Sequence, residues 1–312
     1  MTETGESEQT EDPSDRASRY EESIEVSEGE ERRILEQSEP RLPVTFEVVR
    51  RDGAYEQYRP AISLWWSGLA AGSCIGLSVL AQAILASYLP ETDWARLIEK
   101  AGYSLGFLVV ILAGQQLFTE ITLTAVAPFL LHPSRGGFYR LMRLWSIVLL
   151  ANVCGATLFG ALVVLGRAMS DELIAEILVV SEHAMSFSGS ELAWRGLVAG
   201  FLIALLVWIR ARTVDGQVLM IVLITWLIAA GDFAHIIAGS AEAAILLLSQ
   251  RMSPGDAVFG FFVPTLVGNV IGGTALFAAL AYAQIKNEIR HKKPPGDGAR
   301  AKRSVSDTRT RS

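Results

Sequence analysis

The chain has 312 residues, of which 51% are hydrophobic and 19% charged, and its formal net charge at pH 7 is −6. The mean hydropathy is +0.34, and the charged residues gather at the two ends and between apolar blocks, which indicates an all-α membrane protein with solvated tails. The two cysteines, Cys74 and Cys154, lie in apolar runs and give neither a disulfide framework nor metal-ligand spacing. We therefore expect no metal, no other cofactor and no nucleic-acid partner.

The two ends of the chain differ in charge. Residues 1–40 are acidic and almost without apolar side chains, which predicts a disordered tail rather than a cleavable signal peptide. Residues 41–59 could form a short helix along the membrane face. Residues 60–285 form the expected transport domain, and residues 286–312 form a second disordered tail, rich in Lys and Arg.

Apolar runs within the transport domain predict six transmembrane helices. Polar residues interrupt the second helix at 114–120, and the fifth contains Asp232 and His235 between Gly231 and Gly239. Both are expected to be broken at membrane depth. The predicted spans are 61–89, 101–131, 144–165, 192–209, 218–238 and 257–285.

Arginines in the loops predict the orientation. They occur before the first span, in the loop at 132–143 and directly after the fourth span, whereas the loop at 168–191 has no Lys or Arg. The positive-inside rule then places both termini in the cytoplasm, with the protein in the cell (inner) membrane. Arg96 and Lys100 lie on the opposite side and depart modestly from the rule.

The chain also contains two copies of one unit. Residues 66–72 (WSGLAAG) recur as 194–200 (WRGLVAG), and residues 152–157 (NVCGAT) recur as 269–274 (NVIGGT). The two interruptions match as well, with Gly114 opposite Gly231. Three spans per copy is an odd number, so we expect inverted repeats, in which matching broken helices indicate a midplane transport site. An alternative is that these glycines only allow close packing of helices. That would explain the copied segments, but it would not explain two polar breaks at matching depth.

The polar residues of the fifth span favour a pathway. An imidazole inside an apolar span is costly and ordinarily faces a cavity or a partner, although His235 could also be a hydrogen-bonded histidine of a helix bundle. Asp232 would oppose an anion if it were ionised in the pore. We therefore favour a packing role for Asp232 over a place in a proton relay. In that role it would face a neighbouring helix, paired with Arg195 or capped by backbone.

Four segments in register resemble the formate/nitrite transporter family, over about residues 60–285. Residues 111–119 (ILAGQQLFT) resemble its G-x-x-L-F-T signature, and residues 268–273 (GNVIGG) resemble its G-N-x-x-G-G motif. Asn152 with Gly155 matches the third-span motif, and residues 235–238 (HIIA) match the pore-histidine segment. The resemblance implies an aquaporin-like fold and a homopentamer with one pore in each protomer. The implied substrates are formate, nitrite, hydrosulfide, lactate and acetate.

The resemblance also assigns roles to residues. His235 corresponds to the pore histidine, Asp232 stands three residues before it, and Thr119 corresponds to the hydroxyl partner. The residues implied to form dry constrictions are Leu117 and Phe118, together with Tyr103 and Phe107. The repeat motifs give structural roles to Asn152, Gly155, Asn269 and Gly272.

Departures from the family pattern suggest a divergent branch. Two asparagines of the well-studied formate channels correspond here to Gly200 and Gly239. Because glycine has no side chain, we expect a pocket that is wider or holds extra water, and a weaker preference for formate over larger monocarboxylates.

The chemistry of such a site depends on a proton. A carboxylate in an apolar constriction costs several kcal/mol or more. Transfer of a proton from histidine to a carboxylate costs only about 3.5 kcal/mol in water, and desolvation favours the neutral pair. The sequence thus predicts a channel in which a histidine attracts or protonates a small monovalent anion. The alternatives are a proton-coupled carrier with Asp232 and His235 as the relay, or a membrane anchor or sensor acting through its charged tails. An enzyme is not expected, because the spans contain neither paired glutamates, nor H-E-x-x-H, nor a serine elbow.

Overall fold

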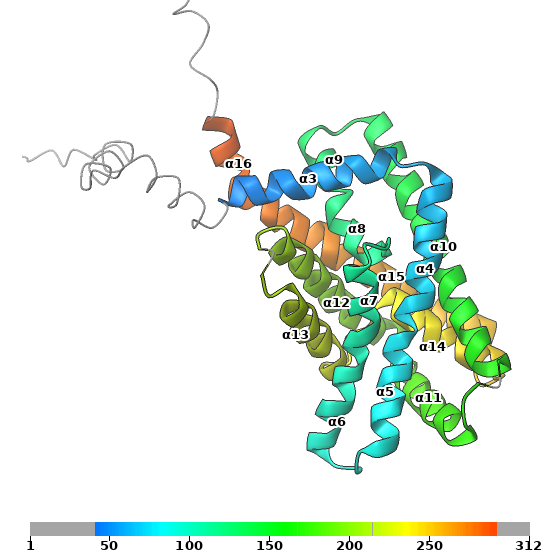
Figure 1. The fold of residues 1–312 in the computed structure, drawn as a ribbon. Helices are drawn as coiled ribbons and strands as arrows, with labels where there is room; N and C mark the ends of the chain where they lie inside the picture. Colours follow the sequence, from blue (N-terminus) through cyan, green and yellow to red (C-terminus); the bar gives the residue numbers. More distant parts are fainter. Residues whose placement is uncertain (1–40, 167, 214, 292–312) are drawn as a thin grey trace, which may run out of the picture. The chain divides into compact units, whose positions relative to one another are not determined.

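A computed structural model of the protein describes residues 41–166, 168–213 and 215–291, with side chains as far as residue 286. Every regular element in these ranges is a helix and none is a strand, which confirms the all-α prediction (Figure 1). The tails predicted at 1–40 and beyond residue 291 lie outside the described residues. The last helix continues to His291, so the C-terminal tail predicted from residue 286 begins as helix.

Short connections join the helices, whose labels are those of Figure 1. A 3₁₀ turn, η1 (Lys100–Tyr103), precedes α7, and two π-helical stretches, η2 (Asp256–Phe262) and η3 (Ile271–Ala278), flank α15. The α-helices are α3 Leu42–Tyr58, α4 Ala61–Ile75, α5 Leu77–Tyr88, α6 Asp93–Glu99, α7 Ser104–Leu112, α8 Phe118–Thr124, α9 Ala127–Leu131, α10 Arg135–Leu165, α11 Asp171–Ala184, α12 Gly189–Arg210, α13 Gln217–Ala230, α14 Ile236–Leu248, α15 Val263–Val270 and α16 Ala279–His291.

Four of the described helical segments are long and apolar enough to cross a membrane. Two further apolar regions are broken: residues 113–117 separate α7 from α8, and residues 231–235 separate α13 from α14. The first break is shorter than the predicted interruption at 114–120, because α8 already begins at Phe118. The four uninterrupted segments are Ala61–Tyr88, Arg135–Leu165, Gly189–Arg210 and Asp256–Lys286.

Two predicted loops are largely helical. The loop expected at 132–143 forms the start of α10, where the hydroxyl of Ser134 accepts a hydrogen bond from the amide of Gly137 (3.0 Å). The loop expected at 168–191 contains α11, which Ser170 caps in the same way. A serine cap followed by acidic residues in the first turn favours a helix at this position, and the hydropathy pattern alone does not reveal it.

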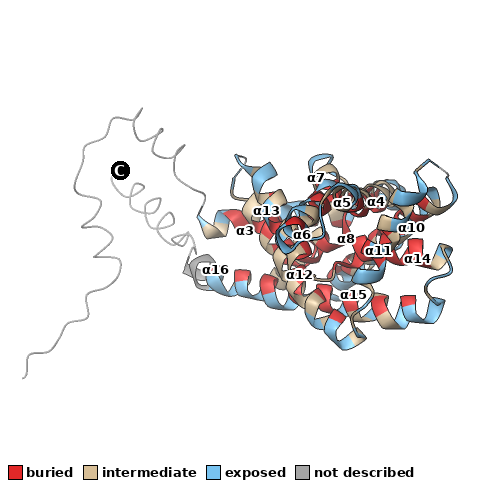
Figure 2. Ribbon diagram, turned by 90° about the horizontal axis from the view of Figure 1, so that it is seen from below, coloured by how far each residue is buried: buried red, intermediate tan, exposed pale blue. Residues whose placement is uncertain are grey.

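Glycines allow α10 to pack closely on α4, and α15 on α12. A side chain at Gly72 would meet the backbone of Asn152, and a side chain at Gly200 would meet the backbone of Asn269. The apolar side chains around these contacts are buried in the interior of the helical bundle (Figure 2). Two further glycines face carbonyl oxygens of the same long helices: Gly155 of α10 faces that of Leu69, and Gly272 of η3 faces that of Leu197.

Helix α3 covers one end of the helices and runs beside α9 (Figure 1). The side-chain amide of Gln57 donates a hydrogen bond to the carbonyl of Ala125 (2.8 Å), and Gly53 lies against the backbone of Thr124, where a side chain would not fit. Arg143 of α10 donates to the carbonyl of Gln57 (3.4 Å). These contacts attach α3 to the segment that follows the first break.

Candidate functional site

The chain leaves the helical path of α7 at Ala113 and resumes it at Phe118. Gly114 has a φ of +63°, the left-handed conformation that glycine adopts without steric cost. The amide of Gln115 then donates to the carbonyl of Val110 (3.0 Å). Leu117 is extended (φ −103°, ψ 127°) and stands directly before α8.

The break between α13 and α14 has the same backbone geometry. Asp232 is left-handed (φ +51°), the amide of Phe233 donates to the carbonyl of Ile228 (2.9 Å), and His235 is extended (φ −106°, ψ 124°) before α14. Gly114 therefore corresponds to Asp232, one residue away from the predicted pairing with Gly231. Aspartate tolerates this conformation better than most residues, but it is strained relative to glycine.

Two buried asparagines bind the breaks. The Oδ1 of Asn152 accepts from the amide of Phe118 (2.8 Å), and its Nδ2 donates to the carbonyls of Gly68 and Gln116 (2.8 Å each). Asn269 makes the three equivalent bonds at the second break, so each asparagine connects a break to the neighbouring long helix. Asn269 Oδ1 accepts from Ile236 (2.9 Å), and its Nδ2 donates to Gly196 and Ala234 (2.8 Å each).

His235 and Thr119 meet where the two breaks face each other. The Nε2 of His235 lies 2.7 Å from the Oγ1 of Thr119, and the two residues are 3% and 0% exposed. Thr119 is the second residue of α8, and His235 immediately precedes α14. The pair predicted from the sequence is thus in direct contact.

The surroundings of the imidazole indicate which nitrogen carries its hydrogen. The amide of Ala238 donates to Nδ1 of His235 (3.2 Å), so Nδ1 is an acceptor and the neutral ring carries its hydrogen on Nε2. Nε2–H then donates to Thr119, whose own hydroxyl hydrogen is not used in any other described hydrogen bond. A second proton at Nδ1 would displace the amide of Ala238.

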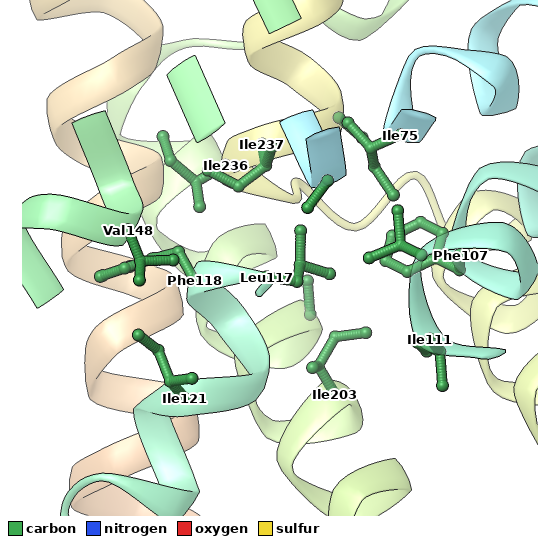
Figure 3. Close-up of a cluster of buried hydrophobic side chains, with 14 of the residues drawn as sticks. Ile75, Phe107, Ile111, Leu117, Phe118, Ile121, Val148, Ile203, Ile236 and Ile237 are labelled. Atoms are coloured by element: carbon green, nitrogen blue, oxygen red, sulfur yellow. The ribbon is translucent and has the colours of Figure 1, made fainter. Parts of the chain in front are cut away.

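Aromatic and aliphatic side chains surround this pair. The ring of Phe107 meets the imidazole edge-on at a centroid distance of 4.9 Å, and Tyr103 packs on Phe107 at 5.2 Å. Leu117 is fully buried and lies at the centre of the apolar cluster, between Phe107 and the residues of α10 (Figure 3). Of the four residues predicted to form constrictions, Phe107 contacts the histidine, Tyr103 lines the same cavity as the histidine, and Leu117 lies in the apolar cluster that contains Phe107.

Phe118, the fourth residue predicted to form a constriction, has a different position. Its ring packs edge-on against Trp145 of α10 at 5.9 Å, and its amide binds Asn152. It lines neither of the hollows described below. Leu117 is extended and precedes α8, whereas Phe118 is the first residue of α8, and its ring packs on α10.

One hollow is lined by His235, and another by the chain neighbours of Thr119. The histidine cavity, of about 60 Å³, is lined by residues that include Tyr103, His235 and Glu242. The leucine hollow, of about 660 Å³, is lined by residues that include Leu117, Glu120 and Arg210. A third hollow, of about 730 Å³, shares Lys100, His183 and Asp232 with the histidine cavity and leads away from it.

The leucine hollow contains an ion pair. Nη1 of Arg210 donates to Oε1 of Glu120 (2.9 Å), and both side chains are largely buried. The charge of Glu120 is therefore balanced within the hollow.

Asp232 pairs with partners other than the one predicted. Its Oδ1 lies 3.1 Å from Nε2 of His183 and 3.4 Å from Nζ of Lys100, and no ion pair joins the carboxylate to Arg195 among the described contacts. Arg195 instead donates to the main-chain carbonyls of Gly231 (3.2 Å) and Asp232 (3.1 Å) and stacks on Phe187. The expected packing role is thus combined with a place at the edge of the histidine cavity.

The predicted empty space at Gly200 and Gly239 is absent from the structure. A side chain at Gly200 would meet the backbone of Asn269, so this glycine lies at a helix interface. A side chain at Gly239 would meet the ring of Phe261, which is 3% exposed and lines the histidine cavity. The prediction of a wider pocket is wrong, because a neighbouring helix and an aromatic ring fill the positions that the glycines leave open.

Three residues of the site were missed or undervalued by reasoning from the sequence. Lys100 was noted only as a departure from the positive-inside rule, and Phe261 was not noted. Glu242 was also missed, although its spacing of seven residues from His235 places it on the same helical face and could have revealed it.

Comparison with known proteins assigns the chain to a family. The model of the formate/nitrite transporter family matches residues 43–283. The inner membrane protein YfdC of Escherichia coli is 35% identical over 285 residues, which are 90% of this chain and 92% of YfdC.

Solved structures have the same fold. An FNT family ion channel superposes with a TM-score of 0.68 at 18% identity, covering 77% of this chain and 98% of that one. A pentameric formate channel with formate bound superposes with a TM-score of 0.60 at 20% identity, covering 72% and 97%. The class of function is therefore membrane transport and not enzymatic catalysis, and the chain belongs to the formate/nitrite transporter family.

Proposed function

We propose that the chain is a transmembrane channel or transporter for small monovalent anions such as formate and nitrite, and that the anion passes His235. The observation that carries this proposal is the buried 2.7 Å contact between His235, which lines the histidine cavity, and Thr119, whose chain neighbours line the leucine hollow. An ionisable side chain at membrane depth marks a pathway by default. The apolar surroundings would exclude hydrated ions, so the anion needs a partner at this point.

The architecture proposed for this route has six spans in two inverted repeats, with broken second and fifth spans. The matched geometry of the two breaks supports it, as do the equivalent bonds of Asn152 and Asn269. Both termini would face the cytoplasm of a cell with the protein in its inner membrane. In support, Arg143 and Arg210 lie near the end covered by α3, where their contacts are to Gln57 and Glu120.

The hydrogen bonds of His235 suggest how the anion would be handled. A proton from the cavity would add to Nδ1, release the amide of Ala238 and make the ring an imidazolium. The imidazolium attracts the anion, and Thr119 donates its free hydroxyl hydrogen to it. Transfer of one proton from the ring to the anion leaves a neutral imidazole and a neutral acid, which crosses the apolar constriction at lower cost.

Liposomes containing the purified chain test this function. We expect influx of formate and nitrite above that of empty liposomes, greater at pH 6 than at pH 8, and slower influx of acetate and lactate. Hydrosulfide, a small anion without a carboxylate, is the fifth anion tested. If none of the five anions enters faster than in empty liposomes at either pH, the proposed function is wrong.

Selectivity among monocarboxylates would depend on Phe261, which fills the space beside Gly239. Phe261→Ala removes a buried ring from the wall of the histidine cavity, so we expect lactate influx to rise relative to formate influx. Phe259→Ala is the matched control, because Phe259 lies in the same π-helical stretch and is 77% exposed. An unchanged formate-to-lactate ratio in Phe261→Ala would show that this wall does not select the substrate.

The proposed assembly is a homopentamer with one pore in each protomer. The similarity to a pentameric formate channel supports it, and exposed aromatic side chains on the long helices, including Trp66 and Trp194, offer apolar faces for lipid or for neighbouring copies. Native mass spectrometry in detergent should show five copies. A monomer that retains full anion influx would contradict this assembly.

A further inference from the structure

Glu242 occupies a position in the histidine cavity that the proposed pathway does not explain. It lies on α14 seven residues after His235, so the two side chains emerge from the same face about two helical turns apart. Glu242 is 7% exposed and lines the histidine cavity. Among the described residues its carboxyl group has no hydrogen-bond or ion-pair partner, so the group faces the cavity itself.

The other charged and titratable groups of this cavity do not offer Glu242 a dedicated partner. The only described ammonium group lining the cavity is that of Lys100, and its Nζ lies 3.4 Å from Asp232, which also contacts His183. The remaining titratable groups there are Tyr103 and His235, and the His235 ring nitrogens already bind Thr119 and the amide of Ala238.

Burial of a carboxylate is costly, and the Lys100 ammonium in the same cavity pairs with Asp232, so a proton on Glu242 removes a cost that Lys100 offsets only in part. An ionised Glu242 would also repel an anion approaching His235. With a proton, the group becomes a donor whose O–H points into the space that the anion must enter. The two states of this one side chain therefore have opposite effects on anion entry.

We propose that Glu242 is a proton-binding residue of the transport route, which admits the anion to the histidine cavity when protonated and excludes it when ionised. This inference rests on the proposed function and names a second proton-dependent group of the same site. In the cycle, Glu242 takes a proton from water in the cavity, donates a hydrogen bond to the anion, and keeps its proton while His235 interacts with the anion. The ligands that Glu242 would admit are the anions of small weak acids, which reach it through the histidine cavity.

The test compares Glu242→Gln with the wild type in liposomes, using tracer formate influx between pH 5 and pH 8. Glutamine has the shape of a protonated glutamate but cannot ionise. We expect equal influx at the acid end and, at the alkaline end, influx about tenfold or more above the wild type, because a like charge within a few ångströms has been removed. Glu242→Asp should retain a pH-dependent profile.

Glu182→Gln is the matched control. Glu182 is an exposed residue on α11 that pairs with Arg251 outside the cavity, so its substitution should leave the wild-type profile unchanged. A Glu242→Gln profile that coincides with the wild type overturns this inference while leaving the proposed function intact. Absence of formate influx in the wild type overturns the proposed function itself.

A second measurement uses the wild-type chain and does not depend on folding of the variant. A hydrophobic carbodiimide reacts with protonated carboxyl groups in apolar surroundings, and mass spectrometry locates the product. We expect modification of Glu242, favoured at acid pH, with a parallel loss of formate influx. Modified Glu242 with full formate influx overturns the inference. So does influx of methylammonium that requires Glu242, because the cavity would then serve a cation.

Discussion

Replacing His235 by alanine is expected to lower formate influx at acid pH about a hundredfold or more and to remove the part of its pH dependence that comes from protonation of the imidazole. The reason is that an anion in the apolar constriction loses the partner that offsets a desolvation cost of several kcal/mol, and each 1.36 kcal/mol is a factor of ten in rate. Thr119→Val keeps the imidazole but removes the hydroxyl that is hydrogen-bonded to it (2.7 Å), so formate influx should fall less than in His235→Ala.

The choice of substitution at His235 separates transport from folding. His235 also accepts a hydrogen bond from the amide of Ala238 and so caps the start of α14. Loss of such a cap lowers the free energy of unfolding by about 1 kcal/mol. His235→Asn can keep this cap but has no group that takes a proton, so it should fold and still lack the pH dependence that the imidazole gives to influx. His132→Ala, outside both hollows, is the histidine control. Unchanged pH-dependent influx in His235→Asn would show that the histidine is not on the route.

Replacing Asn269 by leucine is expected to destabilise the protein severely. Leucine has a similar size but cannot bond to the amide of Ile236 or to the carbonyl of Gly196, which are buried, or to the partly buried carbonyl of Ala234. Each unpaired group costs about 1–3 kcal/mol, so the sum approaches the whole stability of many domains. Asn152→Leu should have the same effect at the first break.

Thermal unfolding in detergent, followed by loss of the monodisperse elution peak, measures this effect. Gln217→Leu serves as the amide control, because it removes only an exposed hydrogen bond to Thr213 (2.9 Å). That control should change stability by less than about 0.5 kcal/mol. An Asn269→Leu protein as stable as the control would mean that the asparagine does not hold the break.

The sequence predicted the parts of the site that depend on chain order. Repeated motifs identify Asn152 and Asn269, and two polar interruptions identify the breaks, because both signals are local. The register of the second break was wrong by one residue, since Asp232 adopts the left-handed conformation that Gly114 adopts in the first. A rule that looks for glycine at such a position therefore selects Gly231 instead.

The rest depended on contacts between distant segments. What fills the space beside a glycine is decided by the neighbouring helix, which is why Gly239 borders Phe261 and not an empty pocket. Lys100 lies far from Asp232 in the sequence, and no local pattern predicts their ion pair. The length of a helix also depends on its cap, as the serines before α10 and α11 show.

The central claim is that a weak acid crosses the protein beside His235 together with a proton. The most direct test records tracer formate influx and internal pH in the same proteoliposomes containing the wild-type chain, with empty liposomes subtracted. We predict that formate enters faster at pH 6 than at pH 8 and that the interior acidifies in proportion to the formate taken up. Formate influx without acidification would mean that the anion crosses alone, and no influx above empty liposomes would mean that the route does not carry it; either result contradicts the account.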